Sequence, residues 1–512
     1  MSDHKMAVVS DLHMGDPRCS LFQVTPQGKY EYELTKGIYY CSSDSSYYNF
    51  PHDSLRMGRI ETHPHEFKQR RIFHKVGVDP DNTIFTTITT HDIKTLIIMG
   101  DMIDVAVQRN DIAYELATLF IKELVNLTKG GERILQEVIY SPGNHDYSIW
   151  RSLQWERDVI NNVNLGHRVQ ETKHVLPCVI WAKDLDQKSK SSLTIYRYKD
   201  FLATANEQSD NSEYRAIYSQ NHKELDRPAH NLSNHLEKLF AGVSLHIVYS
   251  NLYLVNTRTN PAKVTLMTHG QYFEDKWCKS TLEMENWYRF TAMLIDKFGL
   301  SSRNDSNLNL MEQLRDLGIQ NQNMNFAQFI QSNAFVGSDQ SGTLCESGIF
   351  ADTVELCFHR SASQKKGASI QELPDAHNYA KIAKCLSGVP TDIAKPIPHY
   401  LQLSLNELVK IFEHAQISLP PTQFSTLIFG HTHFPGVVNS SITDSEHQCL
   451  SGHDLDDLSH KDLKKYMSGQ VFNTGGWLKS EGISCGALIP ILDSTGEVCD
   501  IVIEPTRHQE TW

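Results

Sequence analysis

The chain has 512 residues, of which 40% are hydrophobic and 21% are charged, and its formal net charge is −13 at pH 7. This length allows two or more domain-sized cores, and the composition is that of an ordinary globular protein. The negative charge argues against a dedicated DNA- or RNA-binding protein, because such proteins bind phosphates mainly through lysine and arginine.

Five short apolar runs each end in polar residues that can bind metal. Runs of four to six apolar residues closed by glycine or polar residues are typical of buried strands. A polar cluster at the carboxyl end of each strand is typical of an α/β sheet, where ligands bind beyond these ends. In chain order the runs are "MAVVSDLH" with Asp11 and His13, "KTLIIMGDMID" with Asp101 and Asp104, "QEVIYSPGNHD" with Asn144, His145 and Asp146, "KVTLMTHG" with His269, and "STLIFGHTH" with His431 and His433.

Other segments predict a β-α-β unit and a hairpin near the end of the chain. Between the second and third runs, "NDIAYELATLFIKELVNLTKGG" has a polar cap, apolar residues at helical spacing and a Gly-Gly stop, which predict a helix. Later, "GQVFNTGGWL" predicts a strand that leads into residues 473–477. The segment "GALIPILDSTGEVCDIVIEP" predicts two strands around a turn at residues 493–496.

The intervals between the clusters predict large insertions, because three of them are much longer than a crossover needs. We expect residues 1–276 to form the first part of a core, with a polar insert at about 19–90 and a mixed insert at about 150–260. Residues 277–420 have helical spacing in "STLEMENWYRFTAMLIDKFGL" and "HYLQLSLNELVKIFEHAQI". We expect this segment to be a mainly helical cap, because both its ends leave from strands that carry candidate ligands. Residues 421–512 would then be the second part of the core.

The five clusters indicate metal chemistry only when they are taken together, because each alone is a weak signal. Together they supply four carboxylates, five imidazoles and one amide, without a thiolate. Oxygen and nitrogen donors of this kind suit manganese, iron or zinc. Two such cations about 3.5–4 Å apart can share one carboxylate and one hydroxide, the arrangement used for in-line attack at phosphorus.

The five motifs, in this order, resemble those of the calcineurin-like metallophosphoesterase family. The resemblance covers strands and loops in residues 7–150, 263–275 and 423–480. It implies a four-layer α/β/β/α sandwich. It also implies two divalent metal ions, with manganese favoured over iron and zinc, and hydrolysis of phosphoric esters by a hydroxide that bridges the two ions.

The resemblance also assigns roles to single residues. It implies seven metal ligands, which are Asp11, His13 and His433 for the first ion, Asn144, His269 and His431 for the second, and Asp101 between the two. It implies that His145 donates a proton to the leaving group and that Asp104 holds this imidazole. A histidine kept protonated by a carboxylate suits a general acid that works near neutral pH.

Two departures narrow the resemblance. The serine/threonine protein phosphatases of this superfamily carry arginine and glutamate where this chain has Val105 and Asp146, which disfavours that branch. The runs "HGQYFED" and "NTGGW" are similar to the branch of UDP-2,3-diacylglucosamine hydrolases, although Gln271 replaces a frequent histidine. The residues that bind substrate stay unassigned.

Several readings of the function stay open at this stage. We expect a hydrolase of a small phosphorylated substrate, which is a phosphodiester, a pyrophosphate or a phosphomonoester. A diester or a pyrophosphate is favoured over a phosphoprotein. One alternative is a catalytically inactive scaffold that binds partners through its inserts, and another is a nuclease of the same superfamily. A nucleic-acid partner is disfavoured by the net charge.

The cysteines and the apolar runs bear on the compartment. The ten cysteines contain no Cys-x-x-Cys pair, which is typical of reduced thiols in a cytosolic compartment. No apolar stretch reaches the length of a membrane span, and "MSDHKMAVVSDLH" has no cleavable signal pattern. We therefore expect a soluble cytoplasmic protein, whose oligomeric state the sequence does not indicate.

Overall fold

The structure is a computed structural model of the chain. It describes residues 4–16, 18–26, 37–43, 55–60, 71–104, 110–147, 149–150, 153, 177–182, 194–197, 238–273, 397–414, 418–433, 435–438, 449–451, 471–478 and 486–504. None of the helices in these ranges is both long and apolar enough to cross a membrane.

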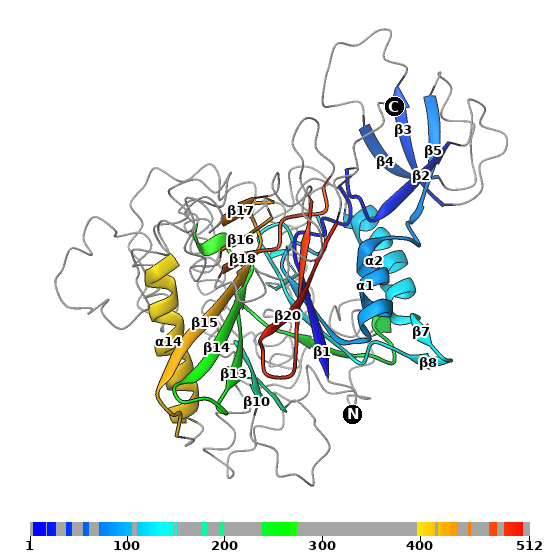
Figure 1. Ribbon diagram of the computed structural model, residues 1–512. Helices are drawn as coiled ribbons and strands as arrows, with labels where there is room; N and C mark the ends of the chain where they lie inside the picture. The colour runs from blue at the N-terminus through cyan, green and yellow to red at the C-terminus, as the bar shows by residue number, and fades with distance from the viewer. Residues whose placement is uncertain are drawn as a thin grey trace, which may run out of the picture.

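Two large β-sheets form the centre of the molecule (Figure 1). The strands of the first sheet, in spatial order, are β12 (Ser244–Ile247), β9 (Glu137–Ser141), β6 (Ile93–Met99), β1 (Lys5–Val9), β19 (Leu488–Leu492) and β20 (Val498–Ile503). The first four of these are parallel, and β19 and β20 are antiparallel to their neighbours. The predicted terminal hairpin is therefore confirmed, and it completes the sheet beside the first strand of the chain.

The second sheet contains the other two strands that carry candidate ligands. Its spatial order is β11 (Thr194–Arg197), β10 (Cys178–Ala182), β13 (Asn251–Asn256), β14 (Ala262–Thr268), β15 (Thr422–Phe429), β18 (Val471–Asn473), β16 (Gly436–Val438) and β17 (Cys449–Ser451). Strands β14 and β15 are parallel, so their carboxyl ends lie at the same edge. Strands β10, β11 and β13 come from the region that the sequence indicated as a mixed insert.

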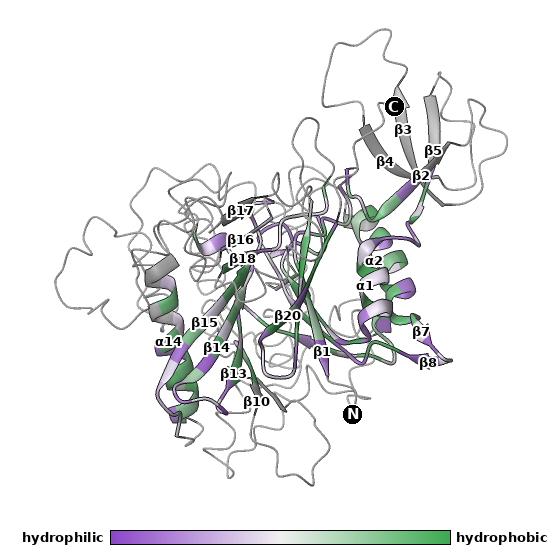
Figure 2. Cartoon of the chain, in the orientation of Figure 1, coloured by the Kyte–Doolittle hydropathy of each residue, from purple (hydrophilic) through white to green (hydrophobic). Residues whose placement is uncertain are grey.

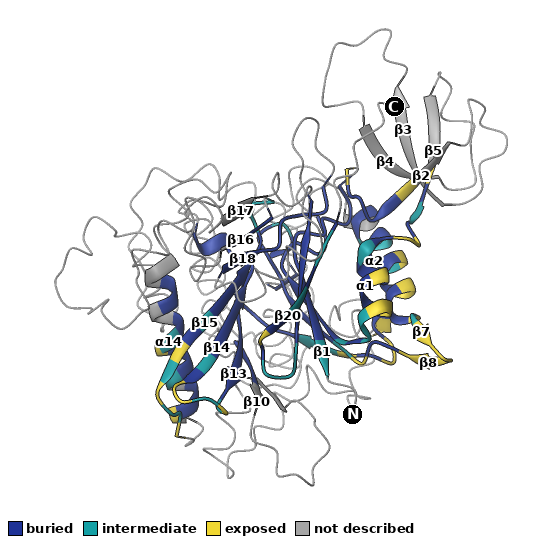
Figure 3. Cartoon of the chain, viewed as in Figure 1, coloured by how far each residue is buried: buried dark blue, intermediate teal, exposed yellow. Residues whose placement is uncertain are grey.

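Apolar side chains fill the space between the two sheets. One cluster contains Val8 and Ile97 from the first sheet together with Leu254, Met267 and Ile428 from the second. Figure 2 shows these strands as predominantly hydrophobic, and Figure 3 shows most of their residues as buried. Each large aliphatic side chain that is fully buried contributes roughly 1.5–3 kcal/mol to folding, so this layer fixes the two sheets face to face.

Helices cover the outer face of each sheet, which gives the four layers α/β/β/α. Helices α1 (Thr83–His91) and α2 (Asn110–Val125) bury their apolar residues in one cluster with the first sheet. Helix α1 begins at Asn82, whose side chain accepts a hydrogen bond from the Phe85 amide at 3.0 Å. Helix α14 (Ile397–His414) covers the second sheet, as Figure 1 shows. The four-layer α/β fold is thereby confirmed.

Helix α14 is held to the second sheet by a buried polar network. Oε2 of Glu407 accepts hydrogen bonds from the Tyr253 hydroxyl and, at 3.1 Å, from Nδ2 of Asn251. The Tyr400 hydroxyl donates to Oδ1 of Asn251 at 2.5 Å. This helix belongs to the segment that the sequence assigned to a cap. Residues 277–396, the rest of that segment before the helix, lie outside the described residues.

The region read as a polar insert contains a separate antiparallel sheet. Its strands, in spatial order, are β2 (Phe22–Pro26), β5 (Arg71–Val78), β3 (Gly37–Ser43) and β4 (Leu55–Ile60). Figure 1 shows this sheet beyond the ends of α1 and α2. A short hairpin of β7 (Thr128–Lys129) and β8 (Glu132–Arg133) follows α2.

Candidate metal centre

The candidate site lies where the carboxyl ends of β1, β6, β9, β14 and β15 meet. Backbone hydrogen bonds join the loops that leave neighbouring strands. The His13 amide donates to the Asp101 carbonyl at 2.8 Å, and the Gly430 amide donates to the His269 carbonyl at 2.9 Å. The two sheets are also joined directly, because the His431 amide donates to Oδ2 of Asp11 at 2.9 Å. Segments that are distant in sequence thus form one rigid edge.

Five candidate ligands have a left-handed backbone conformation. Non-glycine residues with positive φ are uncommon and cost energy, and they persist where the surrounding structure holds them, often at functional sites. The five residues and their φ angles are Asp11 at 53°, His13 at 47°, Asp101 at 51°, His431 at 70° and His433 at 58°. This backbone conformation turns the side chains inward just beyond the strand ends.

Two glycines let these loops approach one another. A Cβ atom on Gly143 would overlap Oδ1 of Asp101, and a Cβ atom on Gly430 would overlap the side chains of Ser10 and Asp11. Any larger residue at either position would displace a candidate ligand, which explains why glycine precedes both Asn144 and His431.

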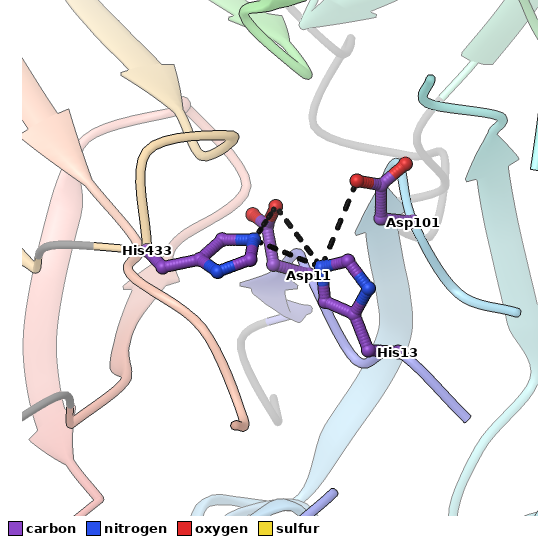
Figure 4. A group of neighbouring side chains, drawn as sticks. All are labelled: Asp11, His13, Asp101 and His433. Carbon is purple, nitrogen blue, oxygen red and sulfur yellow. Dashed lines mark hydrogen bonds and ion pairs between the residues drawn. The ribbon is translucent and has the colours of Figure 1, made fainter. Parts of the chain in front are cut away.

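The first group of donor atoms contains two carboxylates and two imidazoles. Figure 4 shows Asp11, His13, Asp101 and His433 with their polar atoms directed toward one another. Nε2 of His433 lies 2.9 Å from Nε2 of His13 and 3.4 Å from Oδ1 of Asp11. Nε2 of His13 lies 3.9 Å from Oδ1 of Asp11 and 3.7 Å from Oδ2 of Asp101. One donor atom from each residue lies within 4.8 Å of the others, so a single cation could contact all four.

The second group lies on the other side of Asp101. Oδ1 of Asn144 is 2.9 Å from Nε2 of His269 and 2.8 Å from Nδ1 of His431. Nε2 of His269 is 3.3 Å from Oδ2 of Asp101. Nδ1 of His269 faces the Met99 carbonyl at 2.9 Å, and because a carbonyl only accepts, this nitrogen carries the proton. Nε2 is directed at Asn144 and Asp101, and once it has lost its own proton its lone pair could bind a cation there.

Two buried carboxylate oxygens indicate that these groups fit cations. Oδ1 of Asp11 and Oδ2 of Asp101 have no hydrogen-bond partner among the described residues. A buried anionic oxygen without a partner is costly, and both atoms face imidazole nitrogens that could share a cation with them. Carboxylate, amide and imidazole donors also match the preferences of manganese, iron and zinc.

A separate hydrogen-bond network contains His145, Asp104 and His13. Oδ2 of Asp104 lies 3.1 Å from Nδ1 of His145 and 2.8 Å from Nδ1 of His13. The His145 side chain is 25% exposed, whereas the Asp104 side chain is buried. These three residues could be taken for another metal cluster, but Asp104 already accepts from both imidazoles through this oxygen. Asp104 therefore orients both rings through their Nδ1 atoms.

The carboxylates and imidazoles shift one another's pKa in the chain without metal. Burial lowers the pKa of His269, but the charges of Asp101 and Asp11 raise it to about 9 overall. Burial likewise lowers the pKa of His145, but Asp101 and Asp104 raise it to about 10. Burial raises the pKa of Asp101, but His269 and His145 hold it well below its ordinary value. Cations that bind here would therefore replace protons on imidazoles.

Asp146 is a positioning residue to which the sequence assigned no role. Its Oδ2 accepts a hydrogen bond from the Met102 amide at 2.8 Å and from the Tyr140 hydroxyl at 2.5 Å, and its Oδ1 accepts from the Gly143 amide at 2.5 Å. Burial and the charge of Asp101 raise its pKa to about 6. Asp146 thus joins the loops after β6 and β9. The sequence signal that could have indicated this role is the position of Asp146 directly after Asn144 and His145 in "GNHD".

These observations define a candidate centre for divalent metal at the strand ends of an α/β/β/α sandwich. A family model of calcineurin-like phosphoesterases matches residues 4–290, which is more than half of the chain. The chain therefore belongs to the calcineurin-like phosphoesterases, a family of metal-dependent phosphoester hydrolases. No curated protein and no solved structure matches the chain.

The matched span ends before two of the candidate ligands. His431 and His433 follow β15, and the parallel pairing of β15 with β14 places them beside His269. All nine site residues assigned from the sequence lie within this one region of the fold. The similarity to UDP-2,3-diacylglucosamine hydrolases stays an interpretation of two short motifs.

Proposed function

We propose that this chain hydrolyses phosphoric esters at a centre of two divalent metal ions. The observation that carries the proposal is the position of Oδ2 of Asp101, which lies 3.7 Å from Nε2 of His13 and 3.3 Å from Nε2 of His269. Asp101 thus faces both donor groups and is suited to join two cations. The first ion would be held by Asp11, His13 and His433, and the second by Asn144, His269 and His431.

When bound, such ions polarise a phosphoryl oxygen and lower the pKa of a coordinated water. The remaining tasks fall to residues of this chain. His145 has a partly exposed ring and is the candidate donor of a proton, from Nε2, to the leaving oxygen. Asp104 binds Nδ1 of His145 and stabilises its protonated form. Asp146 keeps the loops of Asp101 and His145 in register.

The proposed substrate is a small phosphorylated molecule, with a diester or pyrophosphate favoured. The formal charge of −13 supports this class over a long nucleic acid. The direct test is a turnover screen of the purified chain with Mn²⁺, first on p-nitrophenyl phosphomonoesters and phosphodiesters, then on nucleotide sugars, dinucleotides and phosphopeptides. Hydrolysis of at least one class that is lost in Asp101→Asn supports the proposal. A chain that binds metal and hydrolyses none of these substrates would instead favour the scaffold reading.

A further inference from the structure

A pair of buried hydroxyl groups lies behind Asp11. The Ser10 hydroxyl donates a hydrogen bond to Oδ2 of Asp11 and lies 2.5 Å from the Thr474 hydroxyl. Ser10 has one hydroxyl proton, which it donates to Asp11, so it accepts from Thr474. Both residues are buried. The Thr474 hydroxyl shares its proton with the Phe429 carbonyl at the end of β15, to which it also donates at 3.2 Å.

These contacts divide the two oxygens of Asp11 into different roles. Oδ2 accepts hydrogen bonds from the Ser10 hydroxyl and, at 2.9 Å, from the His431 amide. Oδ1 has no hydrogen-bond partner among the described residues and lies 3.4 Å from Nε2 of His433. The carboxylate therefore cannot rotate without breaking two hydrogen bonds, and its free oxygen is held toward the imidazoles.

The segment that carries Thr474 is tied to other parts of the same site. Nδ2 of Asn473 donates to the Thr432 hydroxyl at 2.6 Å, between the two histidines of that loop. The Trp477 amide donates to the Asp11 carbonyl at 3.1 Å. This segment lies outside residues 4–290, the span that the family model matches.

We propose that Ser10 and Thr474 are positioning residues that hold Oδ1 of Asp11 toward a cation shared with His13 and His433. The hydroxyl pair would set the affinity of this half of the centre for divalent metal. This inference rests on the proposed function only in taking Asp11, His13 and His433 as metal ligands. It does not depend on which ester is hydrolysed.

The test is a Mn²⁺ titration of the full-length chain and of its Ser10→Ala and Thr474→Val variants. Calorimetry and electron paramagnetic resonance measure the binding of the metal. We expect one of two binding events to weaken about 10- to 100-fold, the usual effect of losing a group that orients a ligand, while the other changes less than about twofold. Thr474→Ser keeps the hydroxyl and should restore wild-type binding. The double variant should lose little more than the stronger single variant, because both act on one oxygen.

Thr265→Val is the matched control. Thr265 is also buried, and its hydroxyl donates to a backbone carbonyl, that of Gly496, at 3.0 Å. The Thr265→Val variant should bind both ions as the wild type does, even if its thermal unfolding shows the same loss of stability as that of the Thr474→Val variant.

Three results would overturn the proposal. They are wild-type affinities in Ser10→Ala and Thr474→Val, equal weakening of both ions, and a wild-type chain that binds no Mn²⁺. Selective weakening of one ion in a chain that hydrolyses no phosphoric ester would contradict the proposed function and leave this inference standing.

Discussion

Asp104 accepts a hydrogen bond from Nδ1 of His13 at 2.8 Å. The same oxygen also lies 3.1 Å from Nδ1 of His145. One carboxylate therefore holds both a candidate metal ligand and the candidate general acid. A change at Asp104 should affect metal binding as well as proton donation.

Asp104→Asn tests this double role. The amide is neutral, so it holds two imidazole N–H groups less strongly than a carboxylate does. We expect metal affinity at the half of the centre that contains His13 to fall about 10-fold, and turnover to fall most for substrates with poor leaving groups. Metal titration and a series of esters with different leaving-group pKa values measure the two effects separately. Unchanged metal affinity would show that the hydrogen bond between His13 and Asp104 does not contribute to metal binding.

His145→Ala should keep both metal ions but lose on the order of 10²–10⁴-fold in turnover, which is the usual contribution of a general acid. The deficit should be smaller for p-nitrophenyl esters, because this leaving group departs without a proton. Asp11→Asn is the contrasting variant and should reduce turnover of every substrate by removing a ligand. Loss of a metal in His145→Ala, or a deficit that ignores leaving-group pKa, would exclude His145 as the acid.

Asp101→Asn should lower the occupancy of both metal positions. The residue faces both donor groups, and the amide replaces one anionic oxygen with a nitrogen that does not bind cations. Elemental analysis of the wild type should find two divalent metals per chain, and the variant should retain less than one. Active wild-type protein that contains one metal or none would contradict the dinuclear assignment.

The sequence predicts that residues 277–420 lie over the metal centre and select substrates by size. Helix α14, within this range, covers the outer face of the second sheet instead, so the prediction now applies only to residues 277–396. We expect the full chain to hydrolyse small diesters faster than phosphopeptides or oligonucleotides that share the same scissile bond. The measurement is kcat/KM across substrates of increasing size. An experimental structure that places this segment on the outer face of a sheet, away from Asp101, would show the cap to be wrong.

Glu407 should make stability depend on pH, because burial raises its pKa to about 7 from an ordinary value of 4.5. Below the ordinary value the group is neutral in both the folded and the unfolded chain. As the pH rises toward 7 the unfolded chain ionises first, so the free energy of unfolding falls, and above about 7 the loss is complete.

Glu407→Gln removes this titration and keeps an oxygen that can accept from Tyr253 and Asn251. Relative to the wild type, the variant should gain on the order of 3 kcal/mol between pH 4.5 and 7.5. Urea denaturation of both proteins at several pH values measures the difference. Parallel stability curves would show that Glu407 ionises normally in the folded chain.

The strand ends were predictable because local sequence determines them. Apolar runs closed by glycine and polar residues identified β1, β6, β9, β14 and β15, and helical spacing identified α2 and α14. The antiparallel sheet within residues 19–90 was missed because its strands are polar and lack clear alternation. Strands β10 and β13 were assigned to an insert because no recognisable motif follows them.

The hydrogen bonds that orient the side chains of the site could not be predicted from the sequence. The hydrogen bonds from His13 to Asp104 and from Thr474 to Ser10 join residues that follow different strands, and nothing near any of these residues in sequence indicates its partner. The role of Asp146 depends on Met102 and Gly143, whose amides point toward it only after two strands pair. Local patterns predict which residues stand at strand ends, whereas tertiary packing decides which atoms of those residues stay free.

The position of β1 between β6 and β19 has a consequence for biosynthesis. A ribosome makes β19 several hundred residues after β1, so one edge of β1 has no partner until all the intervening chain has been translated. The histidines at 431 and 433 and the hydroxyl of Thr474 also emerge late. A nascent chain that lacks these residues offers a metal ion only part of the ligand set, so we expect stable metal binding only after His431, His433 and Thr474 have been made and folded.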